Sequence, residues 1–361
     1  MLYLHHLPCS ALRQPPPAGE WLGAACFGGG AADPDATLPL ARVPAPPLGR
    51  PSSCEAWAAA GPLRVGGHGP LRWRCNDEWW FAAVQLDENL NPIACPPLQH
   101  AAQQAYALLF DAMAAAGFEH LVRVWHHVGD ITGEGGGLER YRQFNIGRQE
   151  AFLARGRSVE GGSVPAASAL GAVAGAPLVL YALAGRRPVQ AIENPRQISA
   201  YHYPPHYGPR SPTFSRATLA RAGCGQFLFV SGTASIVGHR SLHPGDVVAQ
   251  TRETMRNLQA VLDEAGQAGA AGWTLPRLHY KVYVRHASDW PQIEAELRSV
   301  VGDGAPVLAL QADVCRSELL VEIEAVGLCG AAGTDRPSTR REDVFSGYRD
   351  RPDSGAIIPK S

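Results

Sequence analysis

Two glutamates, Glu322 and Glu324, lie within a segment that otherwise has the composition of a buried strand. Residues 319–326 read Leu-Leu-Val-Glu-Ile-Glu-Ala-Val, and because side chains alternate between the faces of a strand, both carboxylates share a side with Leu320. Burial disfavours the ionised carboxyl group and raises its pKa, which suits an acid that holds a proton near neutral pH and then donates it. The alternative is that both glutamates face solvent on a one-sided sheet.

A weaker copy of this region, without the acids, precedes it in the chain. Residues 170–185 align without gaps on 312–327, which places Leu180 opposite Glu322. Further segments repeat in the same order, 102–117 with 251–266 and 123–125 with 281–283. Each copy therefore reads strand, helix, strand, helix, strand. Since the first copy has leucine at the position of Glu322, packing does not require an acid there, and the comparison favours a functional role for Glu322.

Other polar side chains could line a cavity. Tyr141 and Arg148 are seven residues apart and therefore on one face if the segment is helical; the alternative is a solvated helix with its arginine on the surface. Tyr201, Tyr203, Tyr207 and Arg210 offer hydroxyl and guanidinium donors on a stiff, proline-rich segment, although such a segment more often only bridges domains.

A glycine turn and a cation form a further candidate group. Residues 230–235, Val-Ser-Gly-Thr-Ala-Ser, read as a strand that runs into a turn containing Ala234. Arg285 ends the strand-like stretch 281–285, which we expect to lie opposite this turn. A turn of this composition is a weak signal by itself.

Length and charge narrow the classes of function. The 361 residues suit two domains of ordinary size. With 32 basic and 33 acidic residues, there is no electrostatic reason to expect a nucleic acid or an anionic membrane as partner. The most apolar stretch, 169–184, contains glycine and proline and reads as core strand rather than membrane span. The N-terminus shows no secretory signal, so we expect a cytoplasmic protein.

Cysteine and histidine spacing gives no indication of a metal centre. The eight cysteines include no C-x-x-C pair, which fits reduced, mostly structural thiols better than a disulfide frame or a zinc site. His126 and His127 are adjacent and would point to opposite faces of a strand, so they do not form a metal-ligand set. We therefore expect no metal and no cofactor.

The composition divides the chain into five segments. Residues 1–70, rich in proline, glycine and alanine, are expected to form a packed arm of loops and edge strands. The first copy occupies 71–190, a tyrosine- and proline-rich linker that contributes to the site occupies 191–215, and the second copy with the acid occupies 216–332. Residues 333–361 are polar and read as a surface tail.

The second copy resembles the RidA/YjgF fold through residues 229–233, 281–284 and 321–326, with Glu322 at the acidic position of that family. A fuller set of segments is similar to the chorismatases, which carry two RidA-like halves on one chain: 141–148, 194–210, 231–239 and 315–322. The resemblance covers roughly residues 70–330. It implies an α+β fold of two tandem RidA/YjgF-like (chorismate mutase-like) α/β sandwich domains, with mixed sheets and helices packed on one face.

The same resemblance implies chorismate as the substrate. Glu322 would protonate the enolpyruvyl methylene, and Arg148, Arg210 and Arg285 would hold the two carboxylates. The remaining residues expected around the substrate are Tyr141, Tyr201, Tyr207 and Ala234. Cys315, seven residues before the acid, marks the members that form hydroxybenzoate; the alternative for it is a buried structural thiol.

We therefore expect a chorismatase that forms pyruvate and hydroxybenzoate, 3-hydroxybenzoate above 4-hydroxybenzoate, for an aryl-polyene pigment such as xanthomonadin or for a quinone such as ubiquinone. One alternative is a chorismate hydrolase that yields a dihydroxycyclohexadiene carboxylate. Others are a RidA-like imine or enamine hydrolase and a RidA-like small-molecule binding protein. The arginine that binds carboxylates in RidA deaminases falls on Val307 here, which weakens the imine hydrolase. The oligomeric state, monomer or trimer, stays open.

Overall fold

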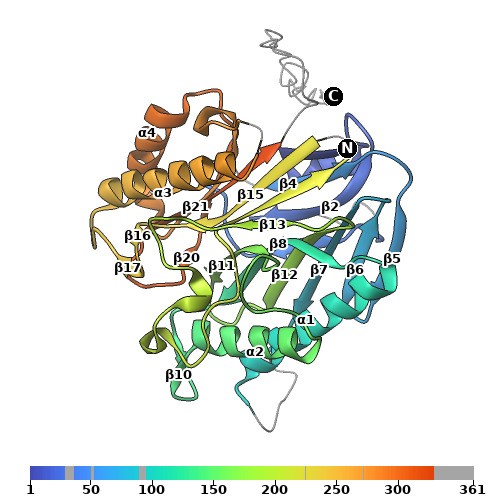
Figure 1. The fold of residues 1–361 in the computed structure, drawn as a ribbon, viewed down its shortest axis with the longest axis horizontal. Helices are drawn as coiled ribbons and strands as arrows, with labels where there is room; N and C mark the ends of the chain where they lie inside the picture. Colours follow the sequence, from blue (N-terminus) through green and yellow to red (C-terminus); the bar gives the residue numbers. More distant parts are fainter. Residues whose placement is uncertain (29–35, 50–52, 89–94, 224, 271, 329–361) are drawn as a thin grey trace, which may run out of the picture.

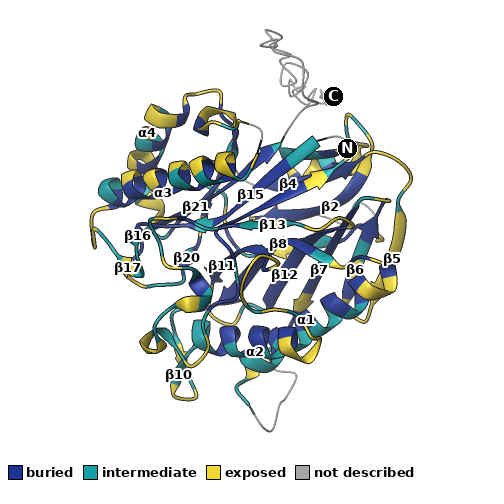
Figure 2. Cartoon of the chain, viewed as in Figure 1, coloured by how far each residue is buried: buried dark blue, intermediate teal, exposed yellow. Residues whose placement is uncertain are grey.

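The computed structural model describes residues 1–28, 36–49, 53–88, 95–223, 225–270 and 272–328. The predicted polar tail, 333–361, lies outside the described residues. Figure 1 shows helices on the outside of the molecule and sheets that face one another across its interior. Figure 2 shows that the strands are buried over most of their length, whereas the helices alternate between buried and exposed residues.

The first unit is a sheet with helices on one face. Its strand order is β20-β11-β8-β12-β7-β6-β5, in which β20 (Asp313–Val314) comes from later in the chain. Its other elements are β5 (Arg64–His68), β6 (Leu71–Cys75), β7 (Trp79–Leu86), α1 (Pro97–Ala116), β8 (His120–Gly129), α2 (Arg140–Ala154), β11 (Ala166–Ala172) and β12 (Leu178–Gly185). α1 has proline in its first turn and ends at Gly117, whose φ of 77° is a left-handed conformation that glycine adopts without strain. The buried faces of α1 and α2 share one core with this sheet.

The second unit repeats this plan. Its strand order is β13-β14-β15-β21-β18-β19, so β19-β18-β21-β15 corresponds strand by strand to β11-β8-β12-β7. Its elements are β13 (Gln190–Ile192), β14 (Ala217–Ala222), β15 (Gly225–Thr233), α3 (Val247–Gln267), β18 (His279–Val284), α4 (Trp290–Val301), β19 (Val307–Gln311) and β21 (Val321–Leu328). Asp246 caps the N-terminus of α3, and its carboxylate accepts a hydrogen bond from the Ala249 amide at 2.9 Å. The predicted fold class, tandem units with mixed sheets and helices on one face, is confirmed.

The N-terminal region contains more regular structure than the arm of loops and edge strands that we expected. Its sheet has the order β1-β4-β2-β3, with β1 (Leu2–Leu7), β2 (Glu20–Phe27), β3 (Leu40–Val43) and β4 (Ser53–Ala59). One face of this sheet packs on the helix-free faces of both units, in a core that includes Trp57, Trp125, Tyr181, Phe229 and Tyr283. Burial against two other sheets explains why a segment rich in proline and glycine forms ordered strands.

Short elements connect the units and border the site. They are η1 (Cys9–Arg13), β9 (Glu134–Gly135), β10 (Leu138–Glu139), η2 (Ala200–His202), η3 (Pro205–Tyr207), β16 (Ile236–Val237), β17 (Arg240–Ser241), η4 (Leu275–Arg277) and η5 (Ala287–Asp289). In the described part of the chain, no helix has the length and apolarity needed to span a membrane.

The register of the two units corrects the gapless alignment by one residue. In the first unit Tyr181 pairs with Trp125, and in the second Glu322 pairs with Tyr283. Because 123–125 corresponds to 281–283, the structural counterpart of Glu322 is Tyr181, not Leu180. Leu180 instead lies in the core beneath the helices. A shift of one residue moves a strand side chain to the opposite face, so the comparison of Leu180 with Glu322 was wrong.

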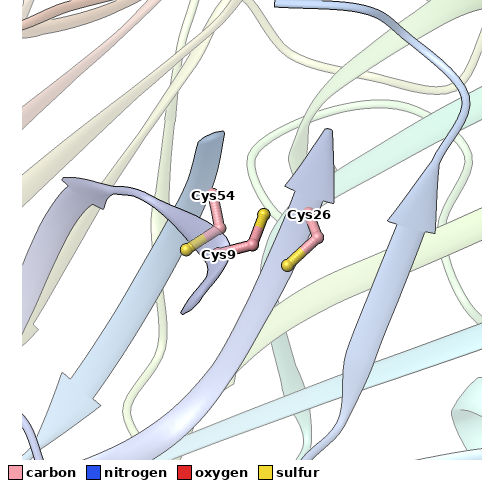
Figure 3. A group of neighbouring side chains, drawn as sticks. All are labelled: Cys9, Cys26 and Cys54. Carbon is pink, nitrogen blue, oxygen red and sulfur yellow. The ribbon is translucent and has the colours of Figure 1, made fainter. Parts of the chain in front are cut away.

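Cys9, Cys26 and Cys54 gather on the far side of the N-terminal sheet, where η1 covers it (Figure 3). Their sulfur atoms all lie within 4.8 Å of one another, a spacing at which thiolates can share a soft metal ion. Hydrogen bonding with Cys26 and Cys9, together with burial, raises the pKa of the Cys54 thiol. A metal would have to displace protons from thiols that are buried in an apolar cluster, so we interpret the group as core residues.

His126 and His127 point to opposite faces of β8, as the sequence predicts. The His126 ring contacts Tyr106 of α1, whereas the His127 ring is stacked on Tyr181 in the core between the sheets. Burial lowers the pKa of both rings, and that of His127 falls to about 3. Both histidines are therefore neutral core residues at physiological pH.

Candidate active site

A cavity of about 270 Å³ lies where the two units meet. The first unit contributes side chains from α2 and β11, the second from β15 and β21, and the connecting segment 197–216 closes one side. Its lining residues are Glu139, Tyr141, Arg142, Arg148, Ala167, Ser168, Ala169, Gln197, Tyr203, Tyr207, Pro212, Phe214, Arg216, Gly232, Ala234, Ile236, Cys315, Arg316, Ser317, Glu318, Leu319 and Glu322. A cavity of this size suits one small molecule.

Glu322 of β21 faces this cavity and is 5% exposed. Gly232 of β15 lies directly against it: a Cβ atom at position 232 would overlap Oε1 of Glu322 and would crowd the hydroxyl of Ser168. Only glycine leaves room for the carboxyl group at this point. The glycine turn in the sequence therefore has a steric role beside the acid.

Glu324, two residues further along the same face, is surrounded by donors. Its carboxylate accepts hydrogen bonds from Trp125 Nε1 at 2.7 Å, from Ser168 Oγ at 2.7 Å and from Tyr283 Oη at 3.1 Å. The guanidinium of Arg123 lies 2.8 Å away and the ammonium of Lys281 lies 2.9 Å away. Two cations and three neutral donors hold this carboxylate in its charged form.

Burial and the nearby Glu324 charge raise the pKa of Glu322 to about 8, against the opposing influence of Arg123 and Arg216. The two neighbouring carboxyl groups thus have different surroundings. Both oxygens of Glu324 accept hydrogen bonds or lie beside cations, whereas Glu322 has a raised pKa that lets it keep a proton at the cavity wall near neutral pH. This separation is the usual arrangement for an acid catalyst beside a permanent anion.

Arg148, Arg216 and Arg316 face the cavity, and none of them forms a salt bridge with a carboxylate in the described part of the chain. Arg148 donates to Asn145 Oδ1 at 2.7 Å, and Arg216 donates to the Ile198 carbonyl at 2.7 Å and the Tyr203 hydroxyl at 3.0 Å. Nε of both Arg148 and Arg216 is buried with no hydrogen-bond partner among the described residues. The cavity therefore presents positive charge that an anionic ligand would neutralise.

Aromatic rings of the connecting segment hold the third arginine. The guanidinium of Arg316 lies 4.3 Å from the ring centre of Tyr207 and 5.3 Å from that of Tyr203. It also donates to the His239 carbonyl at 2.9 Å. The Tyr207 hydroxyl donates to the same carbonyl at 2.7 Å, which fixes this side of the cavity wall.

Cys315 and Tyr141 lie beside Glu322 and are neutral. Burial and the Glu322 charge raise the pKa of the Cys315 thiol to about 12, and burial likewise raises the pKa of the Tyr141 hydroxyl. Because the thiolate is the reactive form of cysteine, a thiol with this pKa is not a nucleophile at neutral pH. Cys315 can shape the cavity and polarise a ligand but does not begin a covalent reaction.

Comparison with known proteins agrees with this geometry. Residues 55–184 match the family described as "Chorismatase FkbO/Hyg5-like, N-terminal", and residues 212–329 match "Endoribonuclease L-PSP". A 3-hydroxybenzoate synthase of Streptomyces hygroscopicus is 37% identical over 285 residues, which are 75% of this chain and 80% of that protein. A chorismatase of Streptomyces rapamycinicus is also 37% identical, over 76% of this chain and 82% of its own length. The chain belongs to the chorismatase family.

A crystal structure of a chorismatase superposes on the present fold with a TM-score of 0.81 at 30% identity, and the match covers 91% of this chain and 98% of that chain. The fold of this chorismatase-family enzyme is therefore that of its relatives over almost the whole described chain.

The cavity brings together most of the residues that the sequence predicts for a chorismatase. Glu322 and Cys315 line it with Tyr141, Arg148, Tyr207 and Ala234. Tyr201 and Arg210 are not among its lining residues: Tyr201 packs on His202 with ring centres 4.7 Å apart, and Arg210 is exposed. The connecting segment therefore contributes Tyr203 and Tyr207 in place of Tyr201 and Arg210.

Arg285 is a correction. We expected it to hold a substrate carboxylate, but it does not line the cavity, and its guanidinium donates to protein acceptors. These acceptors are Asp313 Oδ1 at 2.6 Å, the Leu319 carbonyl at 2.8 Å, the Val314 carbonyl at 2.9 Å and the Arg316 carbonyl at 3.0 Å. Arg285 thus holds the loop that carries Cys315, and it has no contact of its own with the cavity.

Sequence reasoning missed Arg216, Arg316 and Ser168. Arg216 follows the predicted linker and immediately precedes β14, and nothing in the local sequence distinguishes it from other arginines beside strands. Ser168 stands in an alanine-rich strand where a lone hydroxyl carries little information. The role of Ser168 comes from its hydrogen bond to Glu324, which belongs to the other unit.

Proposed function

We propose that this enzyme converts chorismate to hydroxybenzoate and pyruvate, with 3-hydroxybenzoate as the favoured product and Glu322 as the general acid. The observation that carries the proposal is the buried Glu322 carboxyl group, whose pKa is raised to about 8 by burial and by Glu324, at the wall of a cavity that also presents arginines without a salt bridge in the described part of the chain. The names of the relatives, 3-hydroxybenzoate synthase and chorismatase, support the same substrate and product.

Chorismate matches the charge of the cavity. It is a dianion, with one carboxylate on the ring and one on the enolpyruvyl ether, and guanidinium groups bind planar carboxylates through paired hydrogen bonds. Arg148 from the first unit and Arg216 from the second would each take one carboxylate, since each has an unused buried donor. Arg316 supplies further positive charge on the side of the connecting segment.

Glu322 would begin the reaction by giving its proton to the methylene carbon of the enolpyruvyl group. The ether carbon then becomes an oxocarbenium ion, which weakens the bond to the ring, and the resulting glutamate is stabilised by Arg123 and Arg216. If pyruvate leaves with the ether oxygen, the ring is left as a cation that keeps its hydroxyl group. Loss of one ring proton then makes the ring aromatic, as 4-hydroxybenzoate, or as 3-hydroxybenzoate when the hydroxyl first shifts to the carbon that carried the ether. Hydroxybenzoate and pyruvate form in this way with no net uptake of water. If water is consumed instead, the ring leaves as a dihydroxycyclohexadiene carboxylate.

Cys315 would influence whether the ring product is hydroxybenzoate or the dihydroxycyclohexadiene carboxylate. Its neutral thiol lies next to Glu322, where it would contact the ring and keep water from the cation that follows the first step. The use of the product in pigment or quinone synthesis stays a prediction.

Incubation of the purified protein with chorismate tests the proposal. Chromatography identifies the ring product, and a lactate dehydrogenase assay measures pyruvate. We expect pyruvate and hydroxybenzoate in equal amounts. Equal amounts of pyruvate and dihydroxycyclohexadiene carboxylate would overturn the product assignment and leave a hydrolase, and unchanged chorismate would overturn the proposed substrate.

A further inference from the structure

A row of buried charges runs from the N-terminal sheet to the candidate active site. Glu55 of β4 lies 2.8 Å from Lys281 of β18, Lys281 lies 2.9 Å from Glu324 of β21, and Glu324 lies 2.8 Å from Arg123 of β8. All of these side chains are buried. The row therefore joins the N-terminal sheet and both units at the strand that carries Glu322.

Keeping such charges out of water is costly unless each has a partner, and removal of one partner from a buried pair is strongly destabilising. Apolar side chains could have filled the same volume, as they do around Trp57 and Tyr181 in the adjoining core. The position of the row, with its last carboxylate two residues from Glu322, points to a role at the site.

We propose that Glu324 is a positioning residue of this site: its buried carboxylate keeps the neighbouring Glu322 carboxyl in the protonated form and holds Ser168 and Gly232 against it. The inference rests on the proposed function of Glu322 and deepens it, because it names what keeps that acid ready to donate.

Ser168 links the two glutamates by contact. Its hydroxyl donates to Glu324 Oε2 at 2.7 Å and accepts a hydrogen bond from the Gly232 amide at 2.9 Å. Gly232 in turn lies against Oε1 of Glu322. Glu324 thus fixes the serine of the first unit, the serine fixes the glycine of β15, and the glycine forms the wall against which Glu322 rests.

Charge links the two glutamates as well. The groups that face Glu322 are Glu324 on its own strand, Arg123 from the first unit, Arg216 before β14, and the neutral Cys315 and Tyr141. Of these, Glu324 favours the protonated acid and the two arginines oppose it. Burial and the anion together outweigh the cations, which sets the direction of the shift.

The groups around Glu324 keep it an anion. Besides Arg123, these are Lys281 and Tyr283 from β18, with Tyr181 from β12 and Glu55 from β4 behind the lysine. Burial would lower the pKa of Lys281, but the charges of Glu324 and Glu55 outweigh it and raise that pKa. The ammonium therefore stays charged over the working range of the enzyme.

Glu324→Gln tests the inference. In the wild type, kcat/KM should fall as pH rises through about 8, because Glu322 must be protonated to act. When the Glu324 charge is removed, the pH at which kcat/KM falls should be lower by about one to three pH units. Carbon-13 NMR of labelled glutamate carboxyl groups, assigned with Glu322→Gln, measures the Glu322 titration without substrate. Glu253, a buried glutamate of α3, forms salt bridges with Arg196 and Arg256 and provides the matched control. Glu253→Gln should leave both the kinetic and the NMR titration of Glu322 unchanged.

The two readouts separate the two ideas. If the NMR titration of Glu322 moves in Glu324→Gln while the kinetic profile does not follow it, Glu324 acts as we infer and the general-acid role of Glu322 is wrong. If the wild-type kinetic profile follows Glu322 but neither titration moves in the variant, Glu322 is the acid and our inference about Glu324 is overturned.

A second variant covers the case in which Glu324→Gln does not fold. The double variant Arg123→Met, Glu324→Gln replaces both partners of one buried ion pair, so that neither charge is left alone, and it leaves the Glu55–Lys281 pair intact. The Glu322 titration should still move to lower pH, by less than in the single variant, because Arg123 opposes Glu324. A titration at or above the wild-type value would contradict the inference.

Discussion

The two units share their strand order but differ at matching positions of β12 and β21, and of these two strands only β21 lines the cavity. In the first unit β12 has Tyr181 at the position of Glu322, and its ring is stacked on Trp125 with centres 4.8 Å apart. In the second unit β21 has Glu322 there, opposite Tyr283. The first unit therefore uses this position for packing, and the second uses it to hold a proton. Because the site lies between unlike halves, one half can supply the acid and the other Arg148 and Ser168.

The largest effect should come from Glu322→Gln. The amide keeps the shape of the side chain but cannot donate the proton, so turnover of chorismate should fall by about a hundredfold or more. The melting temperature should change little. Glu296 of α4, a partly buried glutamate that pairs with Arg252 of α3 and does not line the cavity, provides the control: Glu296→Gln should keep wild-type turnover. If Glu322→Gln turned over chorismate at the wild-type rate, Glu322 would not be the proton donor, and β21 would not differ from β12 in function as we propose.

Arg148→Met should have the next largest effect, on binding. Methionine keeps the apolar part of the side chain, and loss of one charge-assisted contact to a carboxylate costs about 1.5–3 kcal/mol, or ten- to a hundredfold in affinity. Titration calorimetry in the Glu322→Gln background measures chorismate binding without turnover. Unchanged affinity would show that Arg148 does not bind a carboxylate of chorismate.

Arg285→Met provides a contrast with Arg148→Met. Because Arg285 donates to the loop at 313–319 and not into the cavity, its loss should lower the melting temperature more than it weakens binding. A large loss of affinity with unchanged melting temperature would return Arg285 to the carboxylate clamp.

Leu180→Gln should separate the two faces of β12. Leu180 lies in the core beneath the helices, so a buried amide without partners should lower the free energy of unfolding by about 1–3 kcal/mol. Turnover per folded molecule should stay at the wild-type level, since no residue of β12 lines the cavity. Val173→Gln, at a side chain that is 67% exposed, is the control and should unfold in urea as the wild type does. Equal urea midpoints for the two variants would contradict the register that we describe.

The sequence predicted that Glu322 is buried, and in which unit, because an acidic residue inside an apolar strand is a strong local signal. Its role as the acid stays a prediction. The sequence also predicted the tandem plan, since repeated helix and strand segments survive in both copies. The register failed by one residue because the two units differ in the chain length between matching strands. Ser168 and Tyr181 both pair with Trp125 and are 13 residues apart, whereas Leu310 and Glu322 both pair with Tyr283 and are 12 residues apart. A gapless alignment cannot represent this difference, and a shift of one residue exchanges the two faces of a strand.

The binding residues were predicted less well, for a different reason. Arg285 and Arg216 are both single arginines beside strands, and no local pattern tells which one turns its guanidinium to a loop and which to a cavity. Ser168 acquires its role only through Glu324, 156 residues away. Contacts made between units depend on how the sheets pack, which spacing along one chain does not encode.

Cys315→Val should give the smallest change in rate and the clearest change in product. The side chains are close in volume, so stability should hardly change. If the thiol contacts the ring and excludes water from the cation, its loss should leave chorismate consumption near the wild-type rate but lower the yield of 3-hydroxybenzoate per pyruvate. Dihydroxycyclohexadiene carboxylate or 4-hydroxybenzoate should rise to the same extent, and chromatography with a pyruvate assay measures both. Cys75→Val, at a buried thiol in the core of the first unit, is the control and should leave the product ratio unchanged. An unchanged aromatic yield in Cys315→Val would assign Cys315 to packing, and the choice of product would then depend on other residues of the cavity.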